Sequence, residues 1–135
     1  MKKFIAICLC LITLFATTIS VCASDYQIYS NNVTSASVFL SISSTGKATA
    51  TLEYYGKSGV MKSAKVITKI QKKVGVVWVT VSNGSWTDSS SATHLIKEHS
   101  VQLSGKGTYR AYSTFTFSGT GGSDDKITKT SEKTY

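Results

Sequence analysis

Apolar and polar side chains alternate in run after run of this chain, from residue 35 to its end. Successive side chains of a β-strand point to opposite faces of a sheet, so this alternation predicts strands with one buried and one solvated face. Turn signals rich in glycine, serine and asparagine separate the runs, and the chain has no proline. Seven such strands predict an antiparallel sandwich of two sheets, with a barrel as the alternative.

The predicted strands lie at residues 35–43, 47–55, 63–72, 76–82, 93–103, 108–118 and 126–135. In the fourth strand Val77, Val79 and Val81 are expected to face the core. Asn83-Gly84 is expected to end that strand, and a polar loop to follow at 88–92. In the fifth strand Lys97 and His99 interrupt the apolar positions, which predicts a bulge or a bend.

The first 23 residues have the layout of a secretion signal. Lys2 and Lys3 precede an uncharged apolar run at residues 4–16, and small residues stand three and one positions before a cut after Ala23. We expect cleavage there, and hence an extracellular protein. The expected organisation is a signal peptide at 1–23, a lead-in segment at 24–34 and one β-sandwich domain at 35–135. A lipoprotein cut before Cys22 is the alternative, although Val21 stands where such sites usually have Gly or Ala.

Cys8, Cys10 and Cys22 are the only cysteines, and all three lie in the predicted signal. The exported part therefore offers no disulfide, no thiolate zinc site and no catalytic thiol. Lys2 and Lys3 also leave with the signal, so 13 of the 15 basic residues remain against 7 acidic ones, a net charge of +6. Such a surplus favours anionic partners.

The stretch Leu103-Ser104-Gly105-Lys106-Gly107-Thr108-Tyr109 opens the sixth strand. It resembles the tyrosine corner of immunoglobulin-like and fibronectin type III sandwiches, in which the tyrosine hydroxyl bonds back to the backbone near the corner. The resemblance implies that the seven strands correspond, in chain order, to strands A, B, C, C′, E, F and G.

Four motifs extend the resemblance over residues 36–135. They are Thr-Gly-Lys-Ala-Thr at 45–49, Ile-Gln-Lys-Lys at 70–73 before Trp78, Gly-Thr-Tyr-Arg at 107–110, and the terminal Lys-Thr-Tyr at 133–135. With these motifs the chain is similar to small, uncharacterised secreted proteins of Gram-positive gut bacteria. This second resemblance implies a sandwich outside a bacterial cell and implies no activity.

The two histidines offer little chemistry. His94 and His99 are five residues apart, so on a strand they would point to opposite faces unless a bulge intervenes. Because serines are so numerous, a Ser/His/acid triad can be drawn with Asp88 or Glu98, but no G-x-S-x-G elbow accompanies it. We therefore expect no enzyme activity, no cofactor and no metal.

Two tripeptides match the N-glycosylation pattern: Asn32-Val33-Thr34 and Asn83-Gly84-Ser85. A eukaryotic secretory pathway could use them, whereas in a bacterium the matches arise by chance. Asn83-Gly84 is more typical of a turn.

One predicted surface combines aromatic and basic side chains. If alternate residues of the third, fourth and sixth strands form the core, the intervening ones share one outer face. That candidate binding face contains Lys65, Ile67, Lys69, Trp78, Arg110 and Tyr112. Aromatic rings beside cations suit sugar rings, anionic polymers or a protein partner. The alternative is that Trp78 lies flat beneath lysine stems, which cover apolar surface well.

These observations favour a secreted, non-enzymatic binding or cell-surface-associated module for an anionic envelope polymer, a glycan or a protein. A small secreted hydrolase or a cationic toxin-like effector is the alternative. The basic residues are too spread along the sequence for a nucleic-acid binder, so we expect no nucleic-acid partner. We also expect a monomer, with no stable membrane insertion after signal cleavage.

Overall fold

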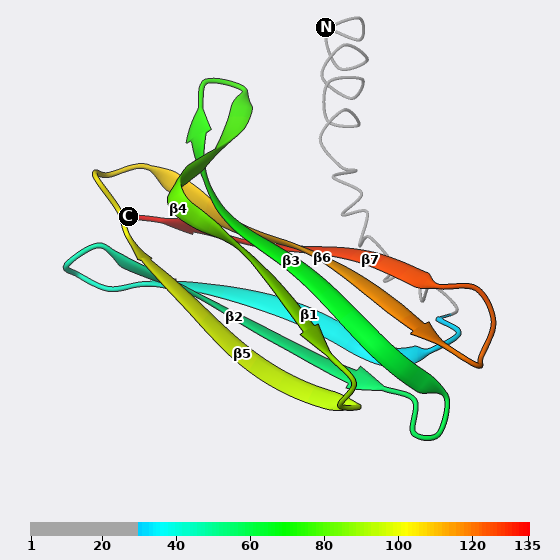
Figure 1. Ribbon diagram of the computed structural model, residues 1–135. Helices are drawn as coiled ribbons and strands as arrows, with labels where there is room; N and C mark the ends of the chain where they lie inside the picture. Colours follow the sequence, from blue (N-terminus) through cyan, green and yellow to red (C-terminus); the bar gives the residue numbers. More distant parts are fainter. Residues whose placement is uncertain (1–29) are drawn as a thin grey trace, which may run out of the picture.

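The computed structural model describes residues 30–135, so the predicted signal peptide and most of the lead-in lie outside the described residues. Within this range seven antiparallel strands form two sheets that pack face to face (Figure 1). None of the described residues belongs to a helix that could cross a membrane. The predicted all-β sandwich is therefore confirmed.

The strands are β1 (Val33–Ile42), β2 (Lys47–Gly56), β3 (Met61–Val74), β4 (Val77–Ser90), β5 (His94–Gln102), β6 (Thr108–Gly119) and β7 (Asp125–Thr134). One sheet has the order β1-β2-β5 and the other the order β4-β3-β6-β7. The two separate sheets rule out the barrel. In chain order the strands take the places A, B, C, C′, E, F and G that the tyrosine corner implied.

The core lies between the sheets and follows the predicted alternation. Every second residue of β2 and of β6 is buried, from Ala48 to Tyr54 and from Tyr109 to Phe117. The core also contains one buried polar pair, Thr68 and Ser113. Their hydroxyls lie 2.9 Å apart, so each provides the hydrogen-bond partner of the other. No buried side-chain nitrogen or oxygen within residues 30–135 lacks a partner.

Tyr109 forms the predicted corner. Its side chain is 1% exposed, and its hydroxyl donates a hydrogen bond of 2.6 Å to the carbonyl oxygen of Gly105. The bond holds the β5–β6 connection close to the start of β6.

The entry into β1 is fixed by Asp125. The carboxylate of this residue accepts hydrogen bonds from the backbone amides of Asn31 at 2.8 Å and Asn32 at 2.6 Å. The Asn32 side chain is fully buried and donates to the carbonyl oxygens of Phe117 and Ser123. Its amide is therefore closed to glycosylation in the folded domain, and β1 begins at Val33, inside the expected lead-in.

β4 differs most from the prediction, because it does not end at Asn83-Gly84. It continues to Ser90 through a bulge, in which four residues of β4 (81–84) lie opposite one residue of β3, Ile70. Asn83 accommodates the bulge with a φ of 57°. The expected polar loop at 88–92 is therefore mostly strand.

The expectation that Val77 and Val79 belong to the core is wrong, since they are 55% and 50% exposed. Pairing of β3 with β6 ends at Lys72, so the last turn of the β3–β4 hairpin extends beyond the sheet. Figure 1 shows this hairpin rising away from the sandwich. Only Val81, closer to the bulge, packs partly against the core.

The bulge or bend expected in β5 is also absent. β5 pairs with β2 in unbroken register from His94 to Gln102. His94 lies opposite Tyr55 on the outer face, and His99 lies opposite the buried Ala50, so the two rings point to opposite faces as the five-residue spacing predicts.

Candidate functional site

The outer face of the β4-β3-β6-β7 sheet carries all six residues of the predicted binding face. Directly paired residues of antiparallel strands lie on the same face. The register aligns Lys69 with Tyr112, and Lys73 with Trp78. It also aligns Gln71 with Arg110. Ile67 and Lys65 continue the same face along β3 at the spacing of alternate residues.

The guanidinium group of Arg110 is the centre of an aromatic cluster on this face. Its central carbon lies 4.4 Å from the ring centroid of Trp78 and 5.1 Å from that of Tyr112. Its Nε donates a hydrogen bond of 2.8 Å to the side-chain oxygen of Gln71. The ammonium of Lys73 lies 5.9 Å from the centroid of the Trp78 ring.

These contacts change what the face can bind. Cations already lie over the Trp78 ring, as the alternative interpretation of this residue anticipated, although the closer one is Arg110 rather than a lysine. Stacking of a sugar on Trp78 would have to displace them. The aromatic rings instead hold a planar guanidinium in place, and such a group is suited to bidentate contacts with carboxylates and phosphates.

We define the basic face as the outward residues of the β4-β3-β6-β7 sheet. Its cations are Lys65, Lys69, Lys73, Arg110 and Lys126, and its one carboxylate among the described residues is Glu132, opposite Arg110. The outer face of the β1-β2-β5 sheet instead carries Lys47, Glu53 and Glu98, with His94. The positive charge is therefore concentrated on one side of the sandwich.

A hollow of about 500 Å³ lies at the end of the basic face remote from Trp78. Its wall includes Lys65 and several hydroxyl side chains: Ser63, Ser89, Ser91, Thr116 and Ser118. Hydroxyls donate or accept hydrogen bonds, and the lysine adds three N–H donors. The hollow thus provides polar contacts at the same end as the Lys65 charge.

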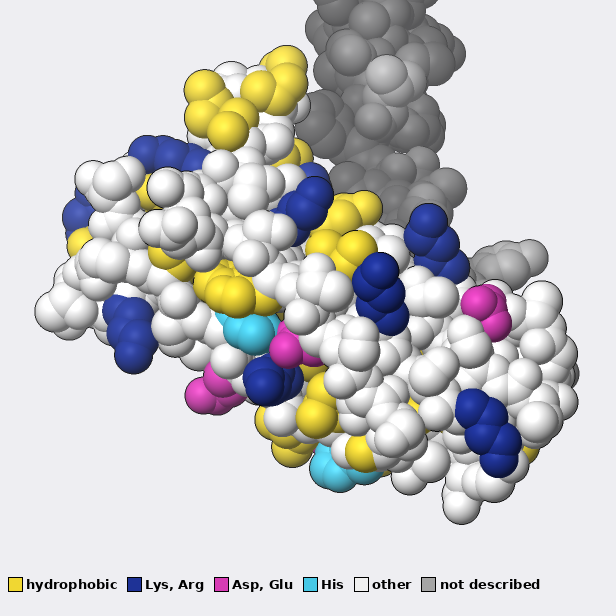
Figure 2. All heavy atoms as spheres, in the orientation of Figure 1, with side chains coloured by type: hydrophobic (Ala, Val, Ile, Leu, Met, Phe, Trp, Pro, Cys, Tyr) yellow, Lys and Arg dark blue, Asp and Glu magenta, His cyan; other side chains and the backbone are white. Residues whose placement is uncertain are grey.

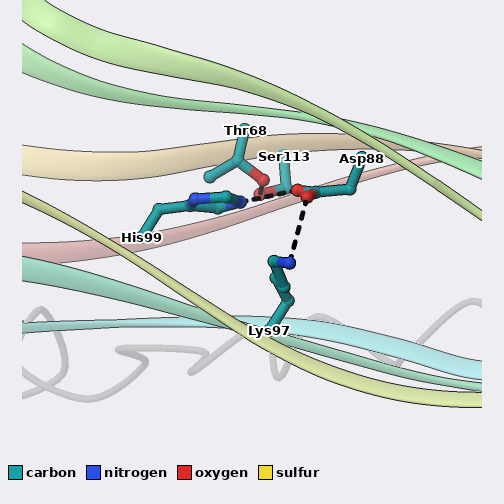
Figure 3. A network of polar contacts seen from close by, with 5 residues as sticks. All are labelled: Thr68, Asp88, Lys97, His99 and Ser113. Atoms are coloured by element: carbon teal, nitrogen blue, oxygen red, sulfur yellow. Dashed lines mark hydrogen bonds and ion pairs between the residues drawn. The ribbon is translucent and has the colours of Figure 1, made fainter.

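A second polar cluster joins the edges of the two sheets (Figure 3). The Nε2 atom of His99 on β5 lies 2.6 Å from a carboxylate oxygen of Asp88 on β4, and the Lys97 ammonium lies 4.0 Å from the other oxygen. The His99 ring stacks on Trp86 with centroids 4.8 Å apart. His99 and Asp88 are only 13% and 15% exposed, so the pair closes the seam between β4 and β5.

Figure 3 shows two hydroxyl side chains near this cluster, those of Thr68 and Ser113. Ser113 is fully buried, and its hydroxyl is bonded to Thr68. Within residues 30–135 no three His, Asp or Glu side chains gather as a metal site would require. The geometry of Asp88 and His99 fits a structural clamp between the sheets.

A third cluster lies on the outer face of β2 and β5. The Tyr55 hydroxyl donates a hydrogen bond of 2.7 Å to Glu53, and the ring of Tyr55 stacks on His94 at 4.3 Å. His94 also lies 3.3 Å from the same Glu53 oxygen. The hydrogen bonds from Tyr55 and then His94 lower the pKa of Glu53, and the bond to Glu53 raises the pKa of Tyr55.

No protein-family model matches this chain, and comparison with curated proteins and with solved structures gave no match. The candidate site therefore rests on its own geometry. Residue-level prediction missed three of its members: Gln71, which orients Arg110, and the cations Lys73 and Lys126. Gln71 and Lys73 share the parity of Lys65 and Lys69 in β3, which is the signal that could have found them.

Proposed function

We propose that this chain is an exported, non-enzymatic binding module that holds a linear polyanion on its basic face. The ligand chemistry is a polymer with repeated phosphate or carboxylate groups, such as an anionic envelope polymer or an acidic glycan. The observation that carries the proposal is the distribution of charge: five cations and one carboxylate share one sheet face, with Arg110 held between two aromatic rings.

The spacing of the cations suits an extended ligand better than a compact one. Lys65, Lys69 and Lys73 follow each other every four residues along β3. At about 3.3–3.4 Å per residue they stand roughly 13 Å apart, so the row extends over roughly 26 Å. A polymer with regularly repeated anions can contact the whole row, whereas a small anion would contact one cation.

The proposal can be tested with the chain from residue 24, which keeps all seven strands. We expect it to bind immobilised polyol-phosphate wall polymer or a uronic-acid polysaccharide, but not neutral dextran, and to bind less tightly as salt is raised. Lys69→Glu should weaken binding at least fivefold, because a charge contact in water contributes about 1 kcal/mol. The matched control is Lys47→Glu, which reverses a charge on the opposite face.

Two results would count against this function. If dextran bound equally well, charge would not be the cause of binding. If Lys69→Glu and Lys47→Glu lowered the affinity equally, binding would not depend on the basic face. The two charged polymers also separate the phosphate from the carboxylate source of the ligand.

The alternative, a hydrolase, has one observation in its favour, which is the contact between Asp88 and His99. We interpret this pair as a clamp, so Asp88→Ala should lower the free energy of unfolding by about 1–3 kcal/mol. Glu98→Ala, an outward change on the facing strand, is the control. A hydrolytic activity that Asp88→Ala abolishes without loss of stability would favour the enzyme instead.

Export and a Gram-positive bacterial source are part of the same proposal. They rest on the signal layout of residues 1–23 and on the resemblance over residues 36–135. N-terminal sequencing of the released protein tests the cleavage, because it should begin at residue 24.

A further inference from the structure

The turn of the β3–β4 hairpin exposes four valines, which we call the valine tip. Val74, Val76, Val77 and Val79 are 53%, 95%, 55% and 50% exposed. The hairpin rises from the sandwich in Figure 1, and in Figure 2 its end is covered by hydrophobic side chains. Folding of the core does not explain these exposed valines. Three of them, Val74, Val76 and Val77, lie beyond the last pairing of β3 with β6, and Val79 lies opposite Lys72, where that pairing ends.

Cations surround the base of the valine tip. Lys72 and Lys73 immediately precede the turn, and Arg110 lies against Trp78, the residue next to Val77. The β5–β6 loop lies close to the base of the hairpin, since an added Cβ on Gly107 of that loop would lie 2.9 Å from the Lys72 side chain. The register places a single carboxylate of the described residues, Glu132, beside these cations. We call Lys72, Lys73 and Arg110 the basic collar.

We propose that the valine tip docks reversibly on an anionic lipid bilayer, with the valines entering the headgroup region and the basic collar contacting lipid phosphates. An apolar projection with cations at its base matches the order of a membrane surface, in which anionic headgroups lie outside an apolar interior. Trp78 would then lie at the depth that tryptophan prefers, the boundary between water and lipid.

Charge decides between this occupant and a second copy of the chain. Two tips that pack on each other would bring two basic collars together, and like charges repel. An anionic surface instead gains a contact from every cation of the collar. The proposal shares Lys73 and Arg110 with the basic face, but it also requires the apolar side chains of the valine tip, which the basic face does not include.

The test is co-sedimentation of the chain from residue 24 with vesicles of phosphatidylcholine alone or with one quarter phosphatidylglycerol. We expect binding to the anionic vesicles, weakened by roughly fivefold for each cation contact that salt screens away. Val76→Asp combined with Val77→Asp should reduce the partition coefficient at least tenfold, because the apolar contact is lost and two negative charges are added.

The matched control is Ile96→Asp, since Ile96 is 56% exposed on the opposite sheet and the change also replaces an apolar side chain by an acid. It should keep most of the binding, and circular dichroism should show all variants folded. Equal binding to both vesicle types, or equal loss in the tip and Ile96 variants, would overturn the proposal. So would a dimer in solution that the tip variant dissolves, which would identify a second copy as the occupant. Polyanion binding should survive in the tip variant, which separates this proposal from the function of the basic face.

Discussion

Tyr109 shows how one side chain can define a corner of the fold. Its ring is buried in the core, while its hydroxyl reaches the carbonyl oxygen of Gly105 four residues earlier. The resemblance of residues 103–109 to a tyrosine corner implied this bond, and the resemblance could be recognised because every atom involved lies within one short segment of the chain.

Tyr109→Phe should lower the free energy of unfolding by about 1–2 kcal/mol, because it leaves the partly buried Gly105 carbonyl without its donor. Chemical denaturation would measure the change. Tyr112→Phe on the same strand is the control, since among the described residues the Tyr112 hydroxyl makes no hydrogen bond, and its loss should change stability by less than about 0.5 kcal/mol. Equal effects of the two variants would show that the hydrogen bond of Tyr109 adds no more to the free energy of unfolding than the Tyr112 hydroxyl does.

The cluster of Glu53, Tyr55 and His94 makes a prediction about pH. Glu53 has a lowered pKa, so its contribution to stability should be present above its unfolded pKa and be lost as the pH falls through the lower folded value. An NMR titration should place the Glu53 midpoint below the ordinary value for a glutamate side chain. Tyr55, whose pKa is raised, should ionise above the ordinary pH range of a tyrosine in an ultraviolet titration.

Glu53→Gln provides the control for that titration. It removes the negative charge that opposes ionisation of Tyr55, so the Tyr55 midpoint should fall back toward its ordinary value. A Tyr55 midpoint that does not move would show that the negative charge of Glu53 is not the cause.

At the scale of elements, β4 marks the limit of what alternation can predict. The pattern Val77, Val79 and Val81 has the period of a half-buried strand, and the strand forms. Periodicity does not reveal whether a facing sheet reaches that far, and here the hairpin extends beyond its neighbour β6. The bulge at 81–84 then shifts the parity, so that Trp86 and Asp88 face inward where an unbroken pattern would place odd-numbered residues.

β5 was predicted to contain a bulge or a bend, and it contains neither. Lys97 and His99 broke the apolar pattern, but β5 is an edge strand, and inward positions at an edge can reach a partner on the other sheet. That partner is Asp88, from a strand whose register depended on the bulge. The contact therefore joins two elements whose relative placement no local pattern contains.

A substitution at Gly84 would test how closely the bulge in β4 is packed. A Cβ at this position would lie 2.5 Å from a methyl carbon of Val81 and 3.1 Å from the carbonyl oxygen of Ile70. Gly84→Ala should therefore cost about 1–3 kcal/mol of stability. Ser82→Ala, at an exposed neighbour in the same bulge, should be nearly neutral in the same denaturation experiment. A neutral Gly84→Ala would mean that the bulge relaxes to admit a methyl group.

The whole molecule separates its charges by sheet. The sequence predicted the surplus of cations and six residues of one face, because alternation alone assigns side chains to faces within a strand. It did not predict how Arg110 lies between Trp78 and Tyr112, since those rings come from strands that are not neighbours in the sheet. Composition likewise gave the net charge but not its placement.

This asymmetry separates two explanations of polyanion binding, net charge and charge placement. Glu53→Gln with Glu98→Gln raises the net charge of the exported chain from +6 to +8 but changes only the β1-β2-β5 face. Lys65→Gln with Lys126→Gln lowers it to +4 and changes only the basic face. Placement predicts unchanged affinity for the first variant and a loss of more than tenfold for the second, at about 1 kcal/mol per contact.

Isothermal titration with the polyol-phosphate polymer at about 0.1 M salt would measure both affinities. If net charge alone governed binding, the variant that lacks Glu53 and Glu98 would bind more tightly than the parent chain. The affinities of both variants and of the parent chain would then rise steadily with net charge. Because counterions screen exposed charges over about 10 Å at 0.1 M salt, cations on the far sheet contribute little to a ligand on the basic face. The glutamate variant should therefore match the parent chain, and only the lysine variant should depart from it.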